Sequence, residues 1–189
     1  MRKSAQYHIR VLQHIRSSLT ADVAKTVACA LVNSRFDCAN AVLYGASEHN
    51  LAKLQRAQNA LARVVTFTKR ADHIQPVLQK LHRLPIKYRV DFKVATIAYK
   101  IRQTGCPAYL ASSVVECMPT RQLRSSSSLL LQSLLTRTAI TCRAFSQAAP
   151  RVWNDLPIDI RNSVTFDRFR SALRTHYYRL AFDNGSCTS

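Results

Sequence analysis

One stretch constrains the possible fold of this chain more than any other: Leu51 to Val65, LAKLQRAQNALARVV. It holds no Gly or Pro and consists of strong helix formers. Its large aliphatic residues recur at helical spacing, and they are Leu51, Leu54, Leu61 and Val65. At about 100° per residue, the cations Lys53, Arg56 and Arg63 fall on roughly the opposite side. We predict a helix with one face in a core and one positively charged face. A merely solvated face is the alternative.

The charge of the whole chain limits the partners it can have. Its 189 residues carry 28 basic and 10 acidic side chains, a formal net charge of +18. This excess is more than solubility requires, and it repels itself unless a polyanion neutralises it. Nucleic acid is the first expectation, followed by an acidic membrane surface and then an acidic protein segment. A hydrophobic content of 47% indicates a globular chain.

Helix signals recur along the chain and predict a mainly α protein. Thr20 is a predicted N-cap, Pro85 suits the first turn of a helix, and Gly105 suits a helix end. Only 3 Gly are present, few for a sheet with many tight turns. Besides the central helix, we predict helices at residues 7–18, 21–33, 34–45, 76–81, 85–104 and 166–180, and a short turn at residues 108–115.

A composition shift divides the chain. Residues 118–128, MPTRQLRSSSS, are basic and rich in Ser, which predicts a linker. We therefore expect a helical domain at residues 1–117, a smaller C-terminal unit at residues 129–182 and a frayed tail at residues 183–189. A short β-hairpin is an alternative for residues 129–144. Trp153 is the one tryptophan and is expected to anchor the core of the C-terminal unit.

Sequence motifs for catalysis or metal binding are absent. The chain has no GxxxxGK[ST] loop, no GxSxG elbow and no HExxH, and its six Cys form no CxxC pair. We therefore expect no catalytic residue and no metal ligand. No apolar run reaches the length of a membrane span or a signal peptide. The expected location is intracellular, nuclear or cytoplasmic and not secreted, with reduced thiols and no membrane partner.

Several blocks, taken in order, resemble one family. They run from Ser4 to Gly45, SAQYHIRVLQHIRSSLTADVAKTVACALVNSRFDCANAVLYG, and then through Leu51–Val65, His73–Lys93, Pro107–Leu110, Arg121–Leu131, Arg143–Arg161 and Phe166–Phe182. This series is similar to the region after the catalytic palm in LINE-type, non-LTR retrotransposon reverse transcriptases. It covers nearly the whole chain. Arg83 stands where the family commonly has Trp, and residues 36–40 read FDCAN where it commonly has LDYCN.

The resemblance implies the thumb and C-terminal extension of an RNA-directed DNA polymerase. The family's Asp-Asp palm, which uses divalent metal, and its endonuclease precede this region, so the resemblance implies a truncated fragment with no cofactor and no activity of its own. A thumb would hold an RNA, RNA–DNA or DNA duplex by its phosphates. The residues expected to make these contacts are Lys53, Arg56, Arg63, Arg89, Lys93, Lys100, Arg121 and Arg124.

Two other functions remain open from the sequence. The helices could form an interaction module whose basic face docks on the upstream palm domain rather than on nucleic acid. The chain could also be a decayed retroelement copy with no function in its host. Binding to a duplex that weakens with salt supports the first expectation. Co-purification with a palm domain, compared with duplex binding, separates it from the interaction module, and the lack of any transcript or peptide favours a decayed copy.

Overall fold

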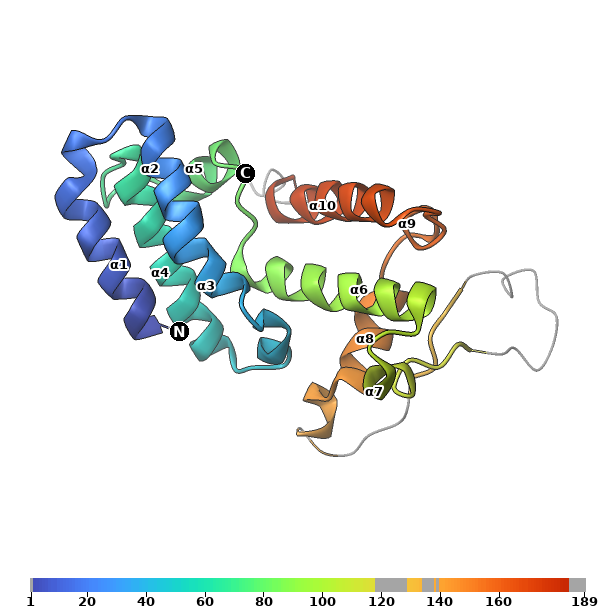
Figure 1. Cartoon of the computed structure of the whole chain (residues 1–189). Coiled ribbons are helices and arrows are strands. Elements are labelled where there is room, and N and C mark those ends of the chain that lie inside the picture. Colours follow the sequence, from blue (N-terminus) through green and yellow to red (C-terminus); the bar gives the residue numbers. More distant parts are fainter. Residues whose placement is uncertain (1, 118–128, 134–137, 139, 184–189) are drawn as a thin grey trace, which may run out of the picture. The chain divides into compact units, whose positions relative to one another are not determined.

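The chain folds into helices along most of its length. The computed structural model describes residues 2–117, 129–133, 138 and 140–183, and it is mainly helical, as predicted (Figure 1). The elements are α1 (Arg2–Ile15), η1 (Arg16–Ser18), α2 (Ala21–Ala28), η2 (Cys29–Asn33), α3 (Ser34–Asp37), η3 (Asn40–Leu43), α4 (Glu48–Thr66), α5 (Ile74–Lys80), α6 (Ile86–Thr104), α7 (Ala108–Ala111), η4 (Thr141–Arg143), α8 (Phe145–Asn154), α9 (Ile158–Arg161) and α10 (Phe166–Phe182).

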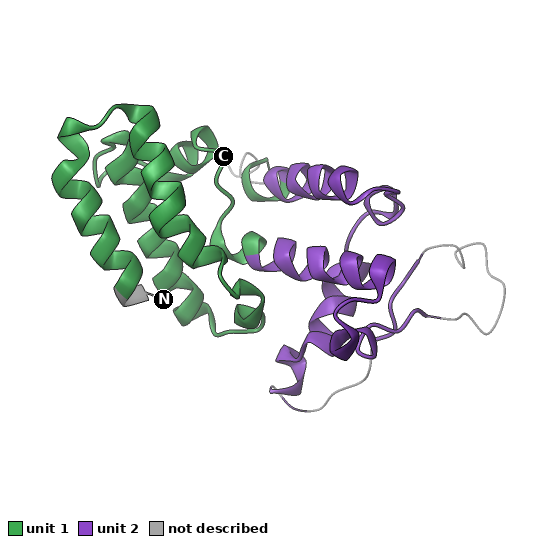
Figure 2. Ribbon diagram, viewed as in Figure 1, with its two compact units in different colours: residues 1–89, 180–189 green, residues 90–179 purple. Residues whose placement is uncertain are grey.

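The helices group into two compact units. The first comprises residues up to Arg89 together with the end of α10 from Leu180, and the second runs from Val90 to Arg179 (Figure 2). This division falls inside α6, whereas the sequence predicted a linker at residues 118–128, which lie outside the described part of the chain. The separation at residues 118–128 therefore stays a prediction.

The first unit is built on the packing of α1 and α2 against α4. The predicted apolar stripe of α4 enters the core, where Leu54, Leu61 and Val65 are buried. Ile9 and Leu12 supply the matching face of α1. These three helices lie side by side (Figure 1) because each buries an apolar stripe against the others.

A buried arginine ties the start of this bundle to the end of α4. The Arg16 guanidinium is 5% exposed and donates to the Val65 carbonyl through Nε at 3.0 Å and through a terminal nitrogen at 2.7 Å. It also donates to the Leu19 carbonyl at 2.8 Å and stacks 4.1 Å from the Phe67 ring centroid. Phe67 has a positive φ of 56° and ends α4 as an αL C-cap. The Arg16 guanidinium therefore provides hydrogen-bond donors for carbonyls that have no partner inside a helix.

Several predicted helix signals are confirmed, and one is wrong. The Thr20 hydroxyl accepts from the Val23 N–H and caps α2, and Gly105, with φ of 64°, follows the end of α6. The predicted continuous helix over residues 34–45 breaks instead at Cys38 and Ala39, where the backbone is extended and then left-handed. This break places Asn40 in the core, where its amide donates to the Arg89 carbonyl at 3.4 Å.

The second unit has an aromatic core. Trp153 and Phe169 are fully buried, and the Phe169 ring stacks 4.3 Å from the Tyr99 ring. Two polar groups of this core are hydrogen-bonded: the Trp153 indole donates to the Leu129 carbonyl at 2.8 Å, and the Tyr99 hydroxyl donates to the Ser163 carbonyl at 2.9 Å. The expectation that Trp153 anchors the core is confirmed.

The described residues of the predicted hairpin region pair elsewhere. Leu131 forms an isolated antiparallel bridge with Glu116 instead of pairing within residues 129–144. The Asn154 amide fixes this segment, because it accepts from the Leu131 N–H and donates to the Leu131 carbonyl, both at 2.9 Å. Residues 134–137 and 139 lie outside the described part of the chain.

Candidate nucleic-acid interface

A groove between α1 and α4 gathers positive charge in the first unit. We call it the α1–α4 groove, and its cavity volume is about 430 Å³. Buried Ile9 and Ala57 form its base where the two helices touch. The complete lining consists of Gln6, Ile9, Arg10, His49, Lys53, Arg56, Ala57 and Ala60.

Helical spacing explains why these side chains share the groove. His49, Lys53, Arg56 and Ala60 follow one another at intervals of three or four residues, so they form a single stripe on α4. Arg10 follows Gln6 at one-turn spacing on α1. One stripe of side chains from each helix thus borders the groove. Each stripe lies next to the apolar stripe through which α1 and α4 pack on one another.

The cations of the groove are available to an external anion. Arg10 and Arg56 are exposed, and Lys53 is half-buried. The Arg56 Nε donates to the Ala52 carbonyl at 3.3 Å, and its terminal nitrogens have no hydrogen bond to any described residue. Among the described residues, no carboxylate pairs with any of these three cations, and no acid lines the groove. Neighbouring positive charges without a counter-ion favour a bound polyanion.

Arg63, which shares α4 with these residues, is already engaged. One terminal nitrogen donates to the Lys69 carbonyl at 3.2 Å, and the other donates to the Asp72 carbonyl at 2.9 Å. These bonds hold the connection between α4 and α5 against the helix. A phosphate at Arg63 would have to share the guanidinium with that loop. The structure therefore places Arg63 outside the lining of the groove.

Arg89 is also engaged within the first unit. Its Nε and a terminal nitrogen donate to one Asp37 carboxylate oxygen at 3.1 and 2.5 Å. Its other terminal nitrogen donates to the Asn33 side-chain oxygen at 3.4 Å. The Arg89 side chain is only 11% exposed, whereas that of Asp37 is 55% exposed. This arginine joins the start of α6 to α3.

The remaining predicted contacts lie in the second unit or outside the described residues. Lys93 and Lys100 are exposed on α6. The Lys100 ammonium lies 4.8 Å from the Phe166 ring centroid, and the Arg170 guanidinium lies 5.5 Å from the same centroid. Arg121 and Arg124 fall in residues 118–128, outside the described part of the chain.

Two further arginines of the second unit, Arg102 and Arg161, were not predicted as phosphate contacts. Arg102 donates twice to one Glu116 oxygen, at 3.0 and 2.7 Å, and lies 4.9 Å from the Trp153 ring centroid. Burial lowers the pKa of Arg161, and the nearby charge of Arg102 lowers it further. Arg102 therefore supports the aromatic core.

Sequence reasoning found two of the three groove cations and missed Arg10. Lys53 and Arg56 belong to one helix and were visible from its periodicity, but their meeting with Arg10 depends on how α1 packs on α4. The available signal was the position of Arg10 directly after Ile9, which is 6% exposed. A cation beside a buried residue lies at the edge of the packed face.

Comparisons with known proteins identify no family for this chain. No protein-family model, curated protein or solved structure matches it. Within the described residues, no group of His, Cys, Asp and Glu could hold a metal ion. No helix in that same part of the chain is both long and apolar enough to cross a bilayer.

Proposed function

We propose that this chain is a nucleic-acid-holding module from the thumb and post-palm region of a non-LTR retrotransposon reverse transcriptase. It would bind the template–primer duplex by phosphate contacts and supply no catalytic group. The α1–α4 groove carries the proposal, because Arg10, Lys53 and Arg56 line it and no carboxylate in the described part of the chain pairs with them. The net charge of +18 and the ordered resemblance of the sequence blocks also support it.

The groove suits phosphates rather than bases. Arginine and lysine side chains contact phosphate oxygens in register along a duplex, and such contacts carry no sequence information. In the second unit, Lys100 and Arg170 lie over the Phe166 ring, and these two cations provide a further positive surface there. Four further residues remain proposed phosphate contacts: Lys93, Lys100, Arg63 and Arg89. Arg63 and Arg89 would bind a phosphate while they also keep hydrogen bonds to their present partners in the chain.

Salt titration tests this function directly. Each phosphate that the protein neutralises contributes about 0.9 to the slope of log affinity against log salt on duplex DNA. Replacing Arg10, Lys53 and Arg56 by Gln should therefore lower the slope by about 2 to 3. Fluorescence anisotropy with a labelled DNA duplex, repeated with an RNA–DNA duplex, measures both affinity and slope.

A matched control separates the groove from net charge. Lys69, Arg70 and Lys87 are exposed in the same unit and lie outside the groove, so their replacement by Gln removes the same three charges. We expect the control to keep most of the affinity. Equal losses in the two triple variants would show that overall charge, not the groove, binds the duplex. An affinity that does not change with salt would reject the function.

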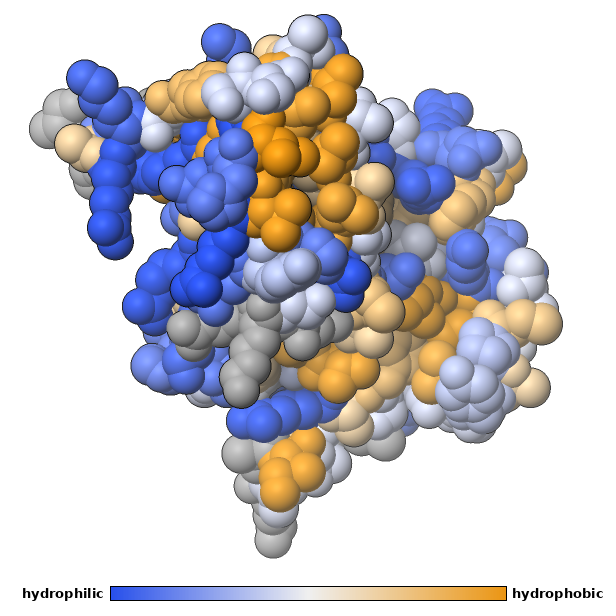
Figure 3. Space-filling model, turned by 60° about the vertical axis from the view of Figure 1, so that its left-hand side comes forward, coloured by the Kyte–Doolittle hydropathy of each residue, from blue (hydrophilic) through white to orange (hydrophobic). Residues whose placement is uncertain are grey.

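An apolar stripe on α1 favours the second candidate function, docking on a palm domain. Tyr7, Val11 and Ile15 recur at one-turn spacing and are 65%, 40% and 45% exposed. Figure 3 brings forward the left-hand side of Figure 1 and shows hydrophobic residues next to hydrophilic ones on this face.

Co-purification with a separately expressed palm domain tests this candidate. Co-purification that is weakened by Val11→Asp but not by the groove variants would support it. Unchanged co-purification with Val11→Asp would reject it.

A further inference from the structure

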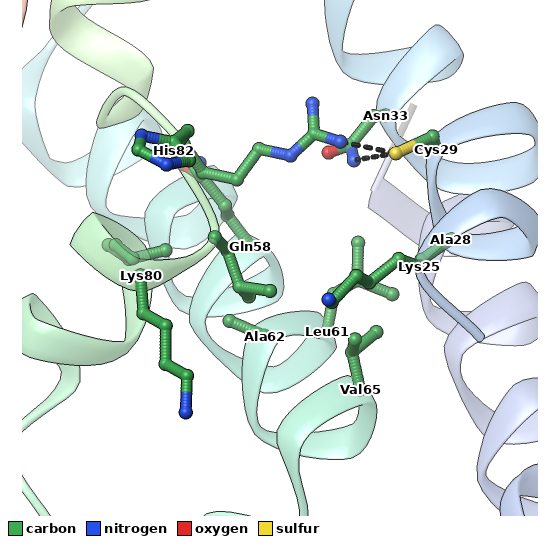
Figure 4. Close-up of a pocket in the computed structure, with 13 residues that line it drawn as sticks. Lys25, Ala28, Cys29, Asn33, Gln58, Leu61, Ala62, Val65, Lys80 and His82 are labelled. Carbon is green, nitrogen blue, oxygen red and sulfur yellow. Dashed lines mark hydrogen bonds between the residues drawn. The ribbon is translucent and has the colours of Figure 1, made fainter. Parts of the chain in front are cut away.

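A second hollow in the first unit lies on the other side of α4 from its charged stripe. We call it the α2–α4–α5 pocket, and its cavity volume is about 170 Å³. Leu61, Ala62 and Val65 from α4 line it together with Ala28 from α2 and Leu78 from α5. Figure 4 shows side chains from these separate segments turned toward a common space. Its interior is therefore mainly aliphatic.

The turn after α5 sets the edge of this pocket. His82 takes a positive φ of 50°, and the Arg83 N–H donates to the Leu78 carbonyl at 2.9 Å, which is the hydrogen bond of a Schellman helix end. This turn directs Arg83 back across the opening. Its guanidinium contacts the Cys29 thiol, to which the Asn33 amide also donates at 3.9 Å (Figure 4).

A buried acceptor in the lining has no partner among the residues that the structure describes. Gln58 is 2% exposed, and its side-chain nitrogen donates to the Leu84 carbonyl at 2.8 Å. No described residue donates to its Oε1 atom. A buried carbonyl oxygen without a donor is unfavourable, so a ligand N–H that reaches it gains a hydrogen bond at little desolvation cost.

The rim of the pocket is cationic. Lys25, Lys80, His82 and Arg83 contribute to the lining, and no acid does. Lys25 pairs with Asp22, whose side chain is 91% exposed and points to solvent, so this pair is weak. The rim thus favours a negatively charged group at the mouth, above the aliphatic interior.

We propose that the α2–α4–α5 pocket holds a single unpaired nucleotide. The base would lie among the aliphatic side chains and donate an N–H to Gln58 Oε1, and the phosphate would lie at the rim beside Lys80. Pockets for larger organic ligands span roughly 300–1,000 Å³, so a cavity of about 170 Å³ suits one ring system. This inference rests on the proposed function, because it adds a base-holding pocket to a phosphate-holding surface.

The Cys29 thiol provides a readout inside the pocket. Alkylation by iodoacetamide, followed by peptide mass spectrometry, reports the accessibility of Cys29, and exposed Cys38 in the same unit is an internal control outside the lining. With AMP at about ten times its dissociation constant, the Cys29 rate should fall about tenfold while the Cys38 rate stays constant. Ribose 5-phosphate, which lacks a base, should give no protection.

Two variants test the proposed contacts. Gln58→Met removes the acceptor at similar size, and Lys80→Gln removes one exposed rim charge without touching the core; each should abolish or sharply reduce AMP protection. Lys69→Gln, an exposed charge change outside the pocket, should keep it. Protection by ribose 5-phosphate equal to that by AMP, or protection that persists in Lys80→Gln and Gln58→Met, would overturn the proposal.

The nucleotide could be free or part of a bound strand, and the arms of the experiment separate these sources. An RNA–DNA duplex with one unpaired nucleotide is compared with a fully paired duplex and with AMP. Protection by AMP supports a free nucleotide, protection by the unpaired duplex alone supports a strand nucleotide, and protection by neither overturns the inference. Duplex anisotropy in the same preparations reports the α1–α4 groove independently, so the two proposals can fail separately.

Discussion

At the scale of single residues, Arg16 shows how a cation can belong entirely to the fold. Its guanidinium is buried and bonded to the Val65 and Leu19 carbonyls. Arg16→Met should lower the free energy of unfolding by about 1–3 kcal/mol, because the Val65 carbonyl then stays buried without a donor. Urea unfolding followed by circular dichroism measures this change.

Arg10→Gln is the matched control, since Arg10 is an exposed arginine on the preceding helix. It should change the free energy of unfolding by no more than about 0.5 kcal/mol. It should nevertheless weaken duplex binding. A stability loss in Arg10→Gln as large as that in Arg16→Met would contradict the different roles given to the two side chains.

His176 makes the stability of the second unit depend on pH. Burial lowers the pKa of His176 below its ordinary value of 6.5. The unfolded chain therefore binds a proton more readily than the folded chain, and the free energy of unfolding falls as the pH drops below 6.5. The free energy of unfolding returns to its full value above pH 6.5.

Urea midpoints at several pH values on both sides of 6.5 check this dependence. His176→Gln should flatten it, because Gln has no proton to bind in this range. Gln75→Ala, an exposed substitution on α5 that involves no titratable group, is the control and should leave the pH profile unchanged. A profile for His176→Gln identical to that of the parent chain would refute the assignment.

At the scale of elements, α4 combines two kinds of arginine. Arg63 holds the connection to α5 through the Lys69 and Asp72 carbonyls, whereas Arg56 presents its terminal nitrogens in the α1–α4 groove. Arg63→Gln should lower the free energy of unfolding by about 0.5–1.5 kcal/mol, the usual net value of a hydrogen bond. Arg56→Gln should weaken binding with little effect on stability. The same urea and anisotropy measurements, with both variants in parallel, check this contrast, and the reverse pattern would contradict it.

The sequence predicted this helix well because its signals are local. The run from Leu51 to Val65 lies within α4, and its apolar stripe is the buried one. Gly105 marks the end of α6 and Thr20 the start of α2 for similarly local reasons. Capping and periodicity depend on neighbours a few residues apart, so one stretch of sequence contains the information.

The features that sequence reasoning missed depend on distant contacts. The left-handed Ala39 that interrupts the helix after Asp37 accompanies the burial of Asn40 against Arg89, almost fifty positions along the chain. The same holds for Arg10, which enters the α1–α4 groove only through the packing of α1 on α4. Both positions carry ordinary local sequence. The partner that decides their role lies far along the chain.

At the scale of the whole molecule, a net charge of +18 opposes compactness. The Debye length shortens from about 30 Å at 0.01 M salt to about 10 Å at 0.1 M, which weakens the repulsion between separated cations. The Tm should therefore rise over this salt range, as followed by differential scanning fluorimetry. A short polyanion such as heparin should raise it at constant ionic strength, and sucrose serves as the uncharged control. A Tm that falls with added salt would contradict the argument.

The order in which the helices pack in the first unit has a consequence for synthesis. α1, α2, α4 and α5 pack on one another within residues 2–80, and small helical bundles of this kind fold rapidly. A ribosome adds about 5–20 residues per second, slower than a small helical bundle folds. We therefore expect the α1–α4 groove to form on the nascent chain while the second unit is still being made, with the segment from Leu180 joining last. A growing chain that already presents this charged groove could meet nucleic acid before its own translation ends.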